Sequence, residues 1–185
     1  RNLHVTLLEK YDQALALANE SPWNMVEGAG RWGIVCNGVS YNYVKDVISE
    51  LNMMDLFRVL RLGFSHPQPG ELIETFLEGC EKVLVVEEGE PYMEEGVRSF
   101  AQKAGATIPI SGKGDGLFSR LYEFNPAMVK KVIGYYFGVP FAPSEPIEIS
   151  DLPAAPARPP NLCAGCPHRA TYVAVREVFG DDAIY

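Results

Sequence analysis

Apolar residues recur at steps of three and four along the beginning of the chain, which places them on one stripe of a helix. The residues that share this stripe are Leu3, Leu7, Leu8, Tyr11, Leu15 and Ala18. Residues 19–30 show little periodicity and include Pro22, Gly28 and Gly30. The pattern therefore predicts a lead-in helix followed by a linker within residues 1–30.

Residues 31–138 alternate short apolar runs with amphipathic stretches of about ten residues or more. The runs that we interpret as strands are 33–36, 58–62, 83–86 and 106–110. Such alternation is typical of βα units that stack on a parallel sheet. The sequence therefore predicts a three-layer α/β/α fold with a mixed, mainly parallel sheet of about five strands.

Local residue types refine this prediction. Residues 83–86 form the most continuous apolar run, which suits a strand covered on both faces, so we place it at the centre of the sheet. Pro109 has no N–H to donate, which predicts an edge position for residues 106–110. Ser40 suits the N-cap of one helix, and Pro126 suits the first turn of another.

A proline-rich stretch separates this region from the end of the chain. Seven prolines lie between residues 139 and 160, and we interpret the stretch as an extended interdomain linker. Residues 161–185 hold a pair of cysteines, a short amphipathic helix and the start of another strand, which predicts the opening of a second domain. The first residue is Arg1 rather than Met, so we expect the chain to begin inside a longer polypeptide.

Composition and charge narrow the class of protein. Of the 185 residues, 47% are hydrophobic and 22% are charged, as in ordinary soluble globular proteins. The net charge of −8 repels a phosphate backbone, so we expect no nucleic-acid partner. No apolar stretch is long enough to span a membrane and no signal-peptide pattern opens the chain, so we expect a cytoplasmic protein.

The cysteines at the end of the chain carry the clearest chemical pattern. Cys163 and Cys166 can reach one metal ion because the turn between them, eased by Gly165, points them the same way. Such a pair serves zinc, an iron–sulfur cluster or disulfide exchange, or consists of two free thiols. One pair cannot complete a four-coordinate site, and His168 is the candidate third ligand for zinc.

Two further features could bind anions or nucleotides. Pro167 opens a helix whose first N–H groups favour an anion such as a diphosphate. At the carboxyl ends of the strands, Glu87 and Glu88 either contribute to a ligand site with Asn37 and Gly38 or cap the following turn. The glycine-rich loop 112–116 has the composition of a phosphate cradle but lacks the ending of a P-loop, so we interpret it as a mobile loop.

Three segments carry a resemblance to a known family. They are residues 38–43 (Gly-Val-Ser-Tyr-Asn-Tyr), residues 85–89 (Val-Val-Glu-Glu-Gly) and residues 162–185, which contain Cys-Ala-Gly-Cys-Pro-His-Arg. Together they resemble the alpha subunit of the indolepyruvate ferredoxin oxidoreductases, in the pyruvate:ferredoxin oxidoreductase superfamily. The resemblance implies a transketolase C-terminal-like domain at 31–138, a linker at 139–160 and the truncated start of a thiamine diphosphate-binding domain at 161–185.

The resemblance also implies a function for the longer protein. That function is the oxidative decarboxylation of arylpyruvates such as indolepyruvate, with thiamine diphosphate and Mg²⁺, [4Fe-4S] clusters, coenzyme A and ferredoxin, and with a beta subunit as partner. Cys163 and Cys166 would then be cluster ligands, and Gly165 and His168 would lie beside the cofactor. The present segment would be an inactive scaffold without a catalytic residue. The alternative is a nucleotide- or coenzyme A-binding Rossmann-like module.

Overall fold

The computed structural model describes residues 2–141, 153, 156–157, 161–162 and 164–180. The chain divides into two compact units, Arg1–Ser144 and Glu145–Tyr185. The first unit contains the sheet and most of the helices. In the second unit, the described helix is α6 (Pro167–Phe179).

Five strands form one mixed sheet in the first unit. They are β1 (Asn24–Glu27), β2 (Trp32–Asn37), β3 (Phe57–Leu62), β4 (Lys82–Val86) and β5 (Ile110–Ser111). Their order across the sheet is β1-β3-β2-β4-β5. Strand β1 runs antiparallel to β3, and all the other neighbours are parallel. The predicted mixed, mainly parallel sheet is confirmed.

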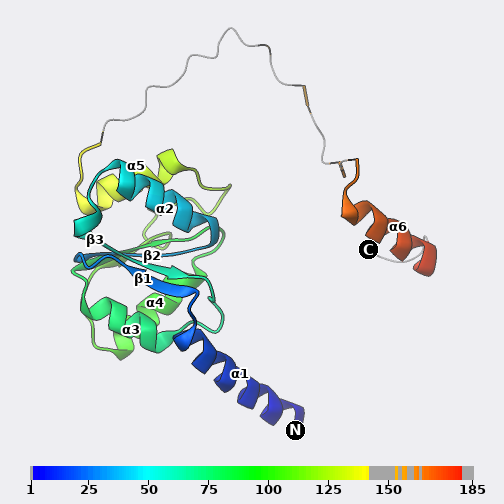
Figure 1. The fold of residues 1–185 in the computed structure, drawn as a ribbon, viewed down its shortest axis with the longest axis horizontal. Coiled ribbons are helices and arrows are strands. Elements are labelled where there is room, and N and C mark those ends of the chain that lie inside the picture. The colour runs from blue at the N-terminus through cyan, green and yellow to red at the C-terminus, as the bar shows by residue number, and fades with distance from the viewer. Residues whose placement is uncertain (1, 142–152, 154–155, 158–160, 163, 181–185) are drawn as a thin grey trace. The chain divides into compact units, whose positions relative to one another are not determined.

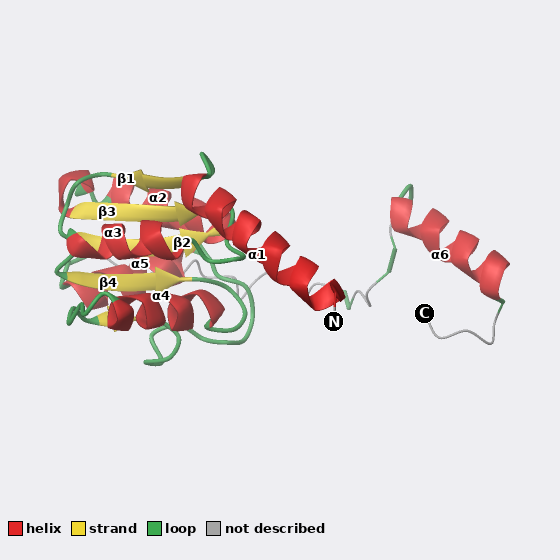
Figure 2. Cartoon of the chain, turned by 90° about the horizontal axis from the view of Figure 1, so that it is seen from below, coloured by secondary structure: helices red, strands yellow, loops and turns green. Residues whose placement is uncertain are grey.

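Helices cover both faces of this sheet (Figures 1 and 2). Those of the first unit are α1 (Asn2–Glu20), α2 (Gly38–Glu50), α3 (Gly70–Glu78), α4 (Tyr92–Lys103) and α5 (Pro126–Phe137), with a short 3-10 turn at Met54–Leu56. Helices α2 and α5 lie on one face, and α3 and α4 lie on the other. The predicted three-layer α/β/α arrangement is therefore confirmed.

Alternating residues of the strands divide the hydrophobic core between the two faces. Ile34 and Leu84 point toward α2 and α5, whereas Val35 and Val85 point toward α3 and α4, and all four are fully buried. This is the side-chain alternation expected of strands covered on both sides. Burial of each such side chain contributes about 1.5–3 kcal/mol to folding.

The positions of two strands differ from the prediction. The central strand is β2, with β3 and β4 beside it, so the placement of residues 83–86 at the centre is wrong. The error has a physical reason: β2 and β4 both have neighbours on either side, and their core residues are equally buried. Strand β1 lies within residues 19–30, where the sequence pattern indicated only a linker.

The ends of the helices follow the sequence more closely. Helix α5 begins at the predicted Pro126, and the Asn125 side chain before it accepts a hydrogen bond from the Met128 N–H. Helix α2 begins earlier than predicted, at Gly38, so Ser40 is not an N-cap but a buried residue of the first turn. The predicted edge position of the strand near Pro109 is confirmed in β5.

Helix α1 carries the predicted apolar stripe but uses little of it for packing. Only Ala18 is buried, whereas Leu3, Leu7 and Leu8 are exposed. Both overall views show α1 projecting from the layered part of this unit (Figures 1 and 2). None of the helices described here is both long and apolar enough to cross a membrane.

Candidate functional site

A buried carboxylate follows strand β4 at the carboxyl edge of the sheet. The Glu87 side chain is only 4% exposed and accepts hydrogen bonds from the backbone N–H groups of Met93 and Glu94, at 2.7 and 2.8 Å. These N–H groups lie in the first turn of α4, where no carbonyl of the same helix can accept their hydrogen bonds. Glu87, directly after β4, therefore caps α4, as one of the sequence interpretations predicted.

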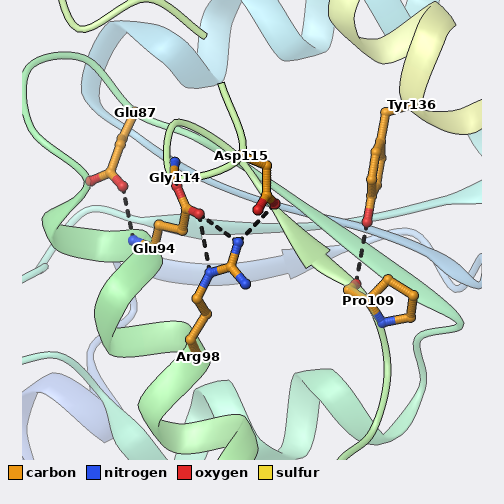
Figure 3. Close-up of polar contacts among 7 residues, drawn as sticks. All are labelled: Glu87, Glu94, Arg98, Pro109, Gly114, Asp115 and Tyr136. Atoms are coloured by element: carbon orange, nitrogen blue, oxygen red, sulfur yellow. Dashed lines mark hydrogen bonds and ion pairs between the residues drawn. The ribbon is translucent and has the colours of Figure 1, made fainter. Parts of the chain in front are cut away.

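Glu94 extends this network toward the loop after β5 (Figure 3). Its carboxylate is 1% exposed and accepts hydrogen bonds from the Arg98 guanidinium at 2.8 and 3.1 Å. It also accepts the backbone N–H of Gly114 at 3.0 Å, and Arg98 pairs with Asp115 at 2.8 Å. Hydrogen bonds from the Ser111 hydroxyl and from Arg98 hold the pKa of Asp115 below its usual range.

Two glycines let the loop approach this carboxylate. A Cβ atom at Gly112 would lie 2.6 Å from a carboxylate oxygen of Glu94, and one at Gly114 would lie 2.8 Å from the other. Since real Cβ atoms do not approach so closely, a larger residue at either position would force the loop or the Glu94 carboxylate to shift. The contacts of Gly114 and Asp115 tie this loop to α4, although its composition suggested a mobile loop.

Lys113 is a buried cation at the centre of the same loop. Its ammonium donates to the backbone carbonyl of Ser119 and lies 4.5 Å from the centre of the Phe124 ring. Burial lowers the pKa of Lys113, and the nearby carboxylates of Glu87 and Glu88 oppose that shift. Burial likewise raises the pKa of Glu87, against its two backbone hydrogen bonds. Attraction between Lys113 and these carboxylates therefore offsets part of the cost of burying their charges.

The four residues predicted for a ligand site at this edge have different roles in the structure. Glu88 accepts the backbone N–H of Phe124 at 2.8 Å, and Glu87 caps α4, so both carboxylates serve internal contacts. Asn37 makes no side-chain cap to α2, and a Cβ atom at Gly38 would meet nothing within 4 Å. Of the four predicted residues, Glu87 is buried, Asn37 and Glu88 are half-buried, and Gly38 is exposed with open space beside it.

A groove in the first unit lies apart from these four residues. Its volume is about 620 Å³, and helices α1, α3 and α4 contribute its walls. The lining includes Tyr11, Gln68, Tyr92 and Phe100 but not Glu87, Glu88, Asn37 or Gly38. The groove therefore does not coincide with the predicted nucleotide site.

The predicted metal and cofactor residues lie at the start of α6, in the second unit. Cys163 lies outside the described residues. Gly165 has a φ of +78°, which glycine adopts at no steric cost, and Cys166 is the N-cap residue of α6. The Cys166 sulfur lies 3.4 Å from Nδ1 of His168.

These residues fit an iron–sulfur cluster in chemistry but do not complete a site. Thiolates are the usual ligands of such clusters, and Cys166 is a partly exposed thiol. Among the described residues, no group of three or more His, Cys, Asp or Glu side chains is placed to hold a metal ion. Any further ligands must therefore come from Cys163 or from residues beyond those described.

Sequence reasoning did not identify Lys113, Glu94 or Arg98 as parts of the buried network. Glu94 and Arg98 are four residues apart on α4, a spacing that favours a pair on one helix face and could have indicated their contact. Nothing local could have placed Gly114 beside Glu94, because that contact joins two separate βα units.

Comparison with known proteins places these observations in a family. No protein-family model matches the chain. It is 39% identical over 194 residues to "Indolepyruvate oxidoreductase subunit IorA" of Methanothermobacter thermautotrophicus, and the match covers 100% of the chain and 30% of that protein. The proteins of the same name from Thermococcus kodakarensis and Archaeoglobus fulgidus are 36% and 39% identical, again over the whole chain and over 29% and 30% of their lengths.

A solved structure titled "Split gene transketolase, inactive beta4 tetramer" resembles part of the chain. The TM-score is 0.45 at 19% identity, over 61% of this chain and 37% of that one. The sequence relatives match the full length of this chain. The chain spans only about 30% of their length. The chain therefore belongs, as a segment, to the family of indolepyruvate oxidoreductase subunit IorA.

Proposed function

We propose that this chain is the structural segment of a thiamine diphosphate-dependent 2-oxoacid:ferredoxin oxidoreductase that acts on arylpyruvates such as indolepyruvate. The observation that carries the proposal is the identity of 35–39% to IorA subunits along the whole chain. In the reaction, the oxoacid loses carbon dioxide and its acyl group forms a thioester with the sulfur of coenzyme A, which releases the thiol proton. Two electrons leave, one to each of two ferredoxins. Thiamine diphosphate, when bound, supplies the carbanion stabilisation that decarboxylation needs.

The first unit serves as a scaffold of the transketolase C-terminal type in this proposal. Its charged groups at the carboxyl edge support that role, because Glu87, Glu94 and Lys113 are buried and bonded to the fold itself. A catalytic acid or base must instead reach a proton of the substrate. Glu88 is likewise engaged with the backbone of Phe124.

In the same proposal, the start of α6 provides two ligands for an iron–sulfur cluster and a helix N-terminus that favours an anion. Cys163 and Cys166 would contribute thiolates to a [4Fe-4S] cluster of the longer protein, and Gly165 and His168 would help to bind thiamine diphosphate with its Mg²⁺. The N-terminal end of α6, which carries no acidic residue in its first turn, supports this assignment because it favours an anion.

One experiment separates the scaffold from the nucleotide-binding alternative. The chain is titrated calorimetrically with coenzyme A and, separately, with thiamine diphosphate and Mg²⁺. We expect no saturable heat with either ligand, because the scaffold needs the rest of the protein to complete a site. A saturable heat with coenzyme A that disappears in the Asn37→Ala variant would establish the binding module instead.

A second experiment tests the cysteines in the longer protein with its partner subunit. Substitution of Cys163 or Cys166 by Ala is expected to lower the iron content and to abolish reduction of ferredoxin by indolepyruvate. The control is Cys80→Ala, which removes a thiol whose pKa is raised by burial to about 11 and which we place in the core. Unchanged iron in both Cys163 and Cys166 variants would remove them as ligands.

A further inference from the structure

The groove between helices α1, α3 and α4 combines aromatic rings with carboxylates. Helix α3 contacts both α1 and α4, and the groove lies where the three helices meet. Its volume of about 620 Å³ falls within the range of about 300–1,000 Å³ that is usual for small-molecule sites. The rings and carboxylates of its lining are those of Tyr11, Tyr92, Phe100, Glu71, Glu74 and Glu95.

Contacts within the protein fix two of these rings in place. The Tyr92 hydroxyl is hydrogen-bonded to Nδ1 of His66 at 2.7 Å, and the Tyr92 carbonyl accepts the side-chain amide of Gln68 at 3.0 Å. The Phe100 ring packs against Gly70, where a Cβ atom would lie 2.5 Å from it. These walls of the groove are therefore shaped before a ligand binds, which reduces the entropy lost on binding.

The charge of the lining is negative and mostly unopposed. Among the residues that the structure describes, Glu71, Glu74 and Glu95 take part in no ion pair. The lining also includes Lys103, whose ammonium lies 5.1 Å from the centre of the Phe100 ring. A cation over the face of a ring is attracted by the ring electrons. Lys103 thus shows that Phe100 accepts a cation, and the carboxylates remain in excess.

From this lining we propose that the groove binds a small organic cation, namely an apolar molecule that carries a protonated amine, amidine or guanidine. The rings contact the apolar body and the face of the cation, and the carboxylates pair with its charge. The anionic phosphates of a nucleotide are repelled by the same carboxylates. Such binding is separate from the scaffold role of the first unit and does not depend on the oxidoreductase reaction.

The ligand is an organic cation and not a metal ion because of how the acidic residues are placed. Within the described part of the chain, no three or more His, Cys, Asp or Glu side chains are grouped so as to hold a metal ion. Separate carboxylates among aromatic rings suit a cation that is spread over several atoms and partly apolar.

The test is calorimetric titration of the longer protein, in complex with its partner subunit, with benzamidine as the probe. Benzamidine joins a phenyl ring to a positive amidinium group, and benzamide is a neutral molecule of nearly the same shape. We expect saturable binding of benzamidine that is at least about tenfold tighter than that of benzamide, because only the cation is attracted by the carboxylates and rings.

Three substitutions and a control assign the binding to the groove. Glu74→Gln and Glu95→Gln should each weaken it about three- to tenfold, since each removes one negative charge. Lys103→Met should strengthen it about threefold, because the competing ammonium beside Phe100 is lost. The control Glu78→Gln changes an exposed glutamate of α3 that does not line the groove, and it should alter the affinity less than about twofold.

The other outcomes decide against the proposal or separate it from the proposed function. Equal affinities for benzamidine and benzamide, or an equal loss in Glu78→Gln and Glu95→Gln, would overturn it. Saturable binding by the longer protein alone that disappears in the complex would assign the groove to the partner subunit and overturn the choice of a small molecule. Binding that follows the variants as expected, in a complex that does not reduce ferredoxin with indolepyruvate, would support the cation site while the proposed function fails.

Discussion

At the scale of single residues, the fold uses buried carboxylates as connectors. Glu87 follows β4 and accepts hydrogen bonds from backbone N–H groups of α4. Glu94 on α4 accepts a hydrogen bond from the backbone N–H of Gly114, which follows β5. Glu87 thus links the end of β4 to α4, and Glu94 links α4 to the loop after β5. These contacts form only when the chain is folded. A buried charge is tolerated there because hydrogen bonds from backbone or guanidinium groups replace those of water.

Removal of the Glu87 side chain is expected to destabilise the fold. Glu87→Ala leaves the N–H groups of Met93 and Glu94 buried without their acceptor, so the free energy of unfolding should fall by about 1–3 kcal/mol. The measurement is urea unfolding followed by circular dichroism. Glu95→Ala, an exposed glutamate in the same helical turn, is the control and should change it by less than about 0.5 kcal/mol. Equal effects of the two substitutions would contradict the capping role.

Glu27 on β1 is expected to make stability depend on pH. It accepts hydrogen bonds from Lys45 and Tyr41, both at 2.5 Å, and these contacts lower its pKa below the ordinary 4.5. A carboxyl with a lowered folded-state pKa stabilises the protein above its unfolded value, and this contribution is lost as pH falls through the folded value. Glu27→Gln should therefore reduce stability by about 1 kcal/mol at pH 7.

The pH profile itself provides the check. The difference in unfolding free energy between Glu27→Gln and the unchanged chain should shrink as pH falls below about 4.5, since the native carboxyl becomes neutral as well. Denaturant midpoints measured between pH 7 and pH 3 report this difference. A constant difference across that range would show that the charge of Glu27 contributes nothing.

Residue roles could be predicted from the sequence only where a local rule applied. The positions of Glu87 and Glu88 at a strand end indicated either a ligand site or a cap, and the structure shows Glu87 as a cap for α4. The burial of Lys113 was beyond prediction, because its partner is the carbonyl of Ser119 in the far half of its own loop. The roles of four residues remain predictions: metal ligation by Cys163 and Cys166, and cofactor binding by Gly165 and His168.

At the scale of elements, local and non-local causes of structure separate clearly. Helix α5 begins at the predicted Pro126, and its caps in the structure, Asn125 and Gly138, are residue types with a local preference for those positions. Strand β1 could not be predicted, because Asn24–Glu27 has no apolar alternation and becomes a strand by pairing with β3. The order of strands in the sheet is equally non-local, which is why the centre was misplaced.

The cap of α5 gives a prediction at this scale. The Asn125 side chain accepts the Met128 N–H at 2.9 Å, so Asn125→Ala should lower the free energy of unfolding by about 1 kcal/mol. Asn125→Asp should retain most of this stability, because a carboxylate accepts the same hydrogen bond and its charge is favourable at a helix N-terminus. Chemical denaturation of the three proteins is the measurement, and equal loss in both variants would exclude a capping role.

At the scale of the whole molecule, the first unit is stabilised by its three layers and not by the helix that precedes them. Every residue of α1 from 2 to 13 is exposed, and the helix reaches the core only at Ala18. The junction is instead secured by Asn24, whose side chain donates to the carbonyls of Ala18 and Phe64 and accepts the Phe64 N–H.

Truncation of α1 and substitution of Asn24 should therefore have different effects on the free energy of unfolding. Removal of the first twelve residues should leave the unfolding free energy within about 0.5 kcal/mol, because every residue from 2 to 12 is exposed. Asn24→Ala should lower it by about 1–3 kcal/mol, since the buried carbonyl of Ala18 and the N–H of Phe64 lose their partner. Urea unfolding of both variants is the measurement, with the exposed Asn2→Ala as control. A large loss on truncation would mean that the apolar stripe of α1 packs within this chain, whereas an unchanged midpoint leaves Leu3, Leu7 and Leu8 available for contacts outside it.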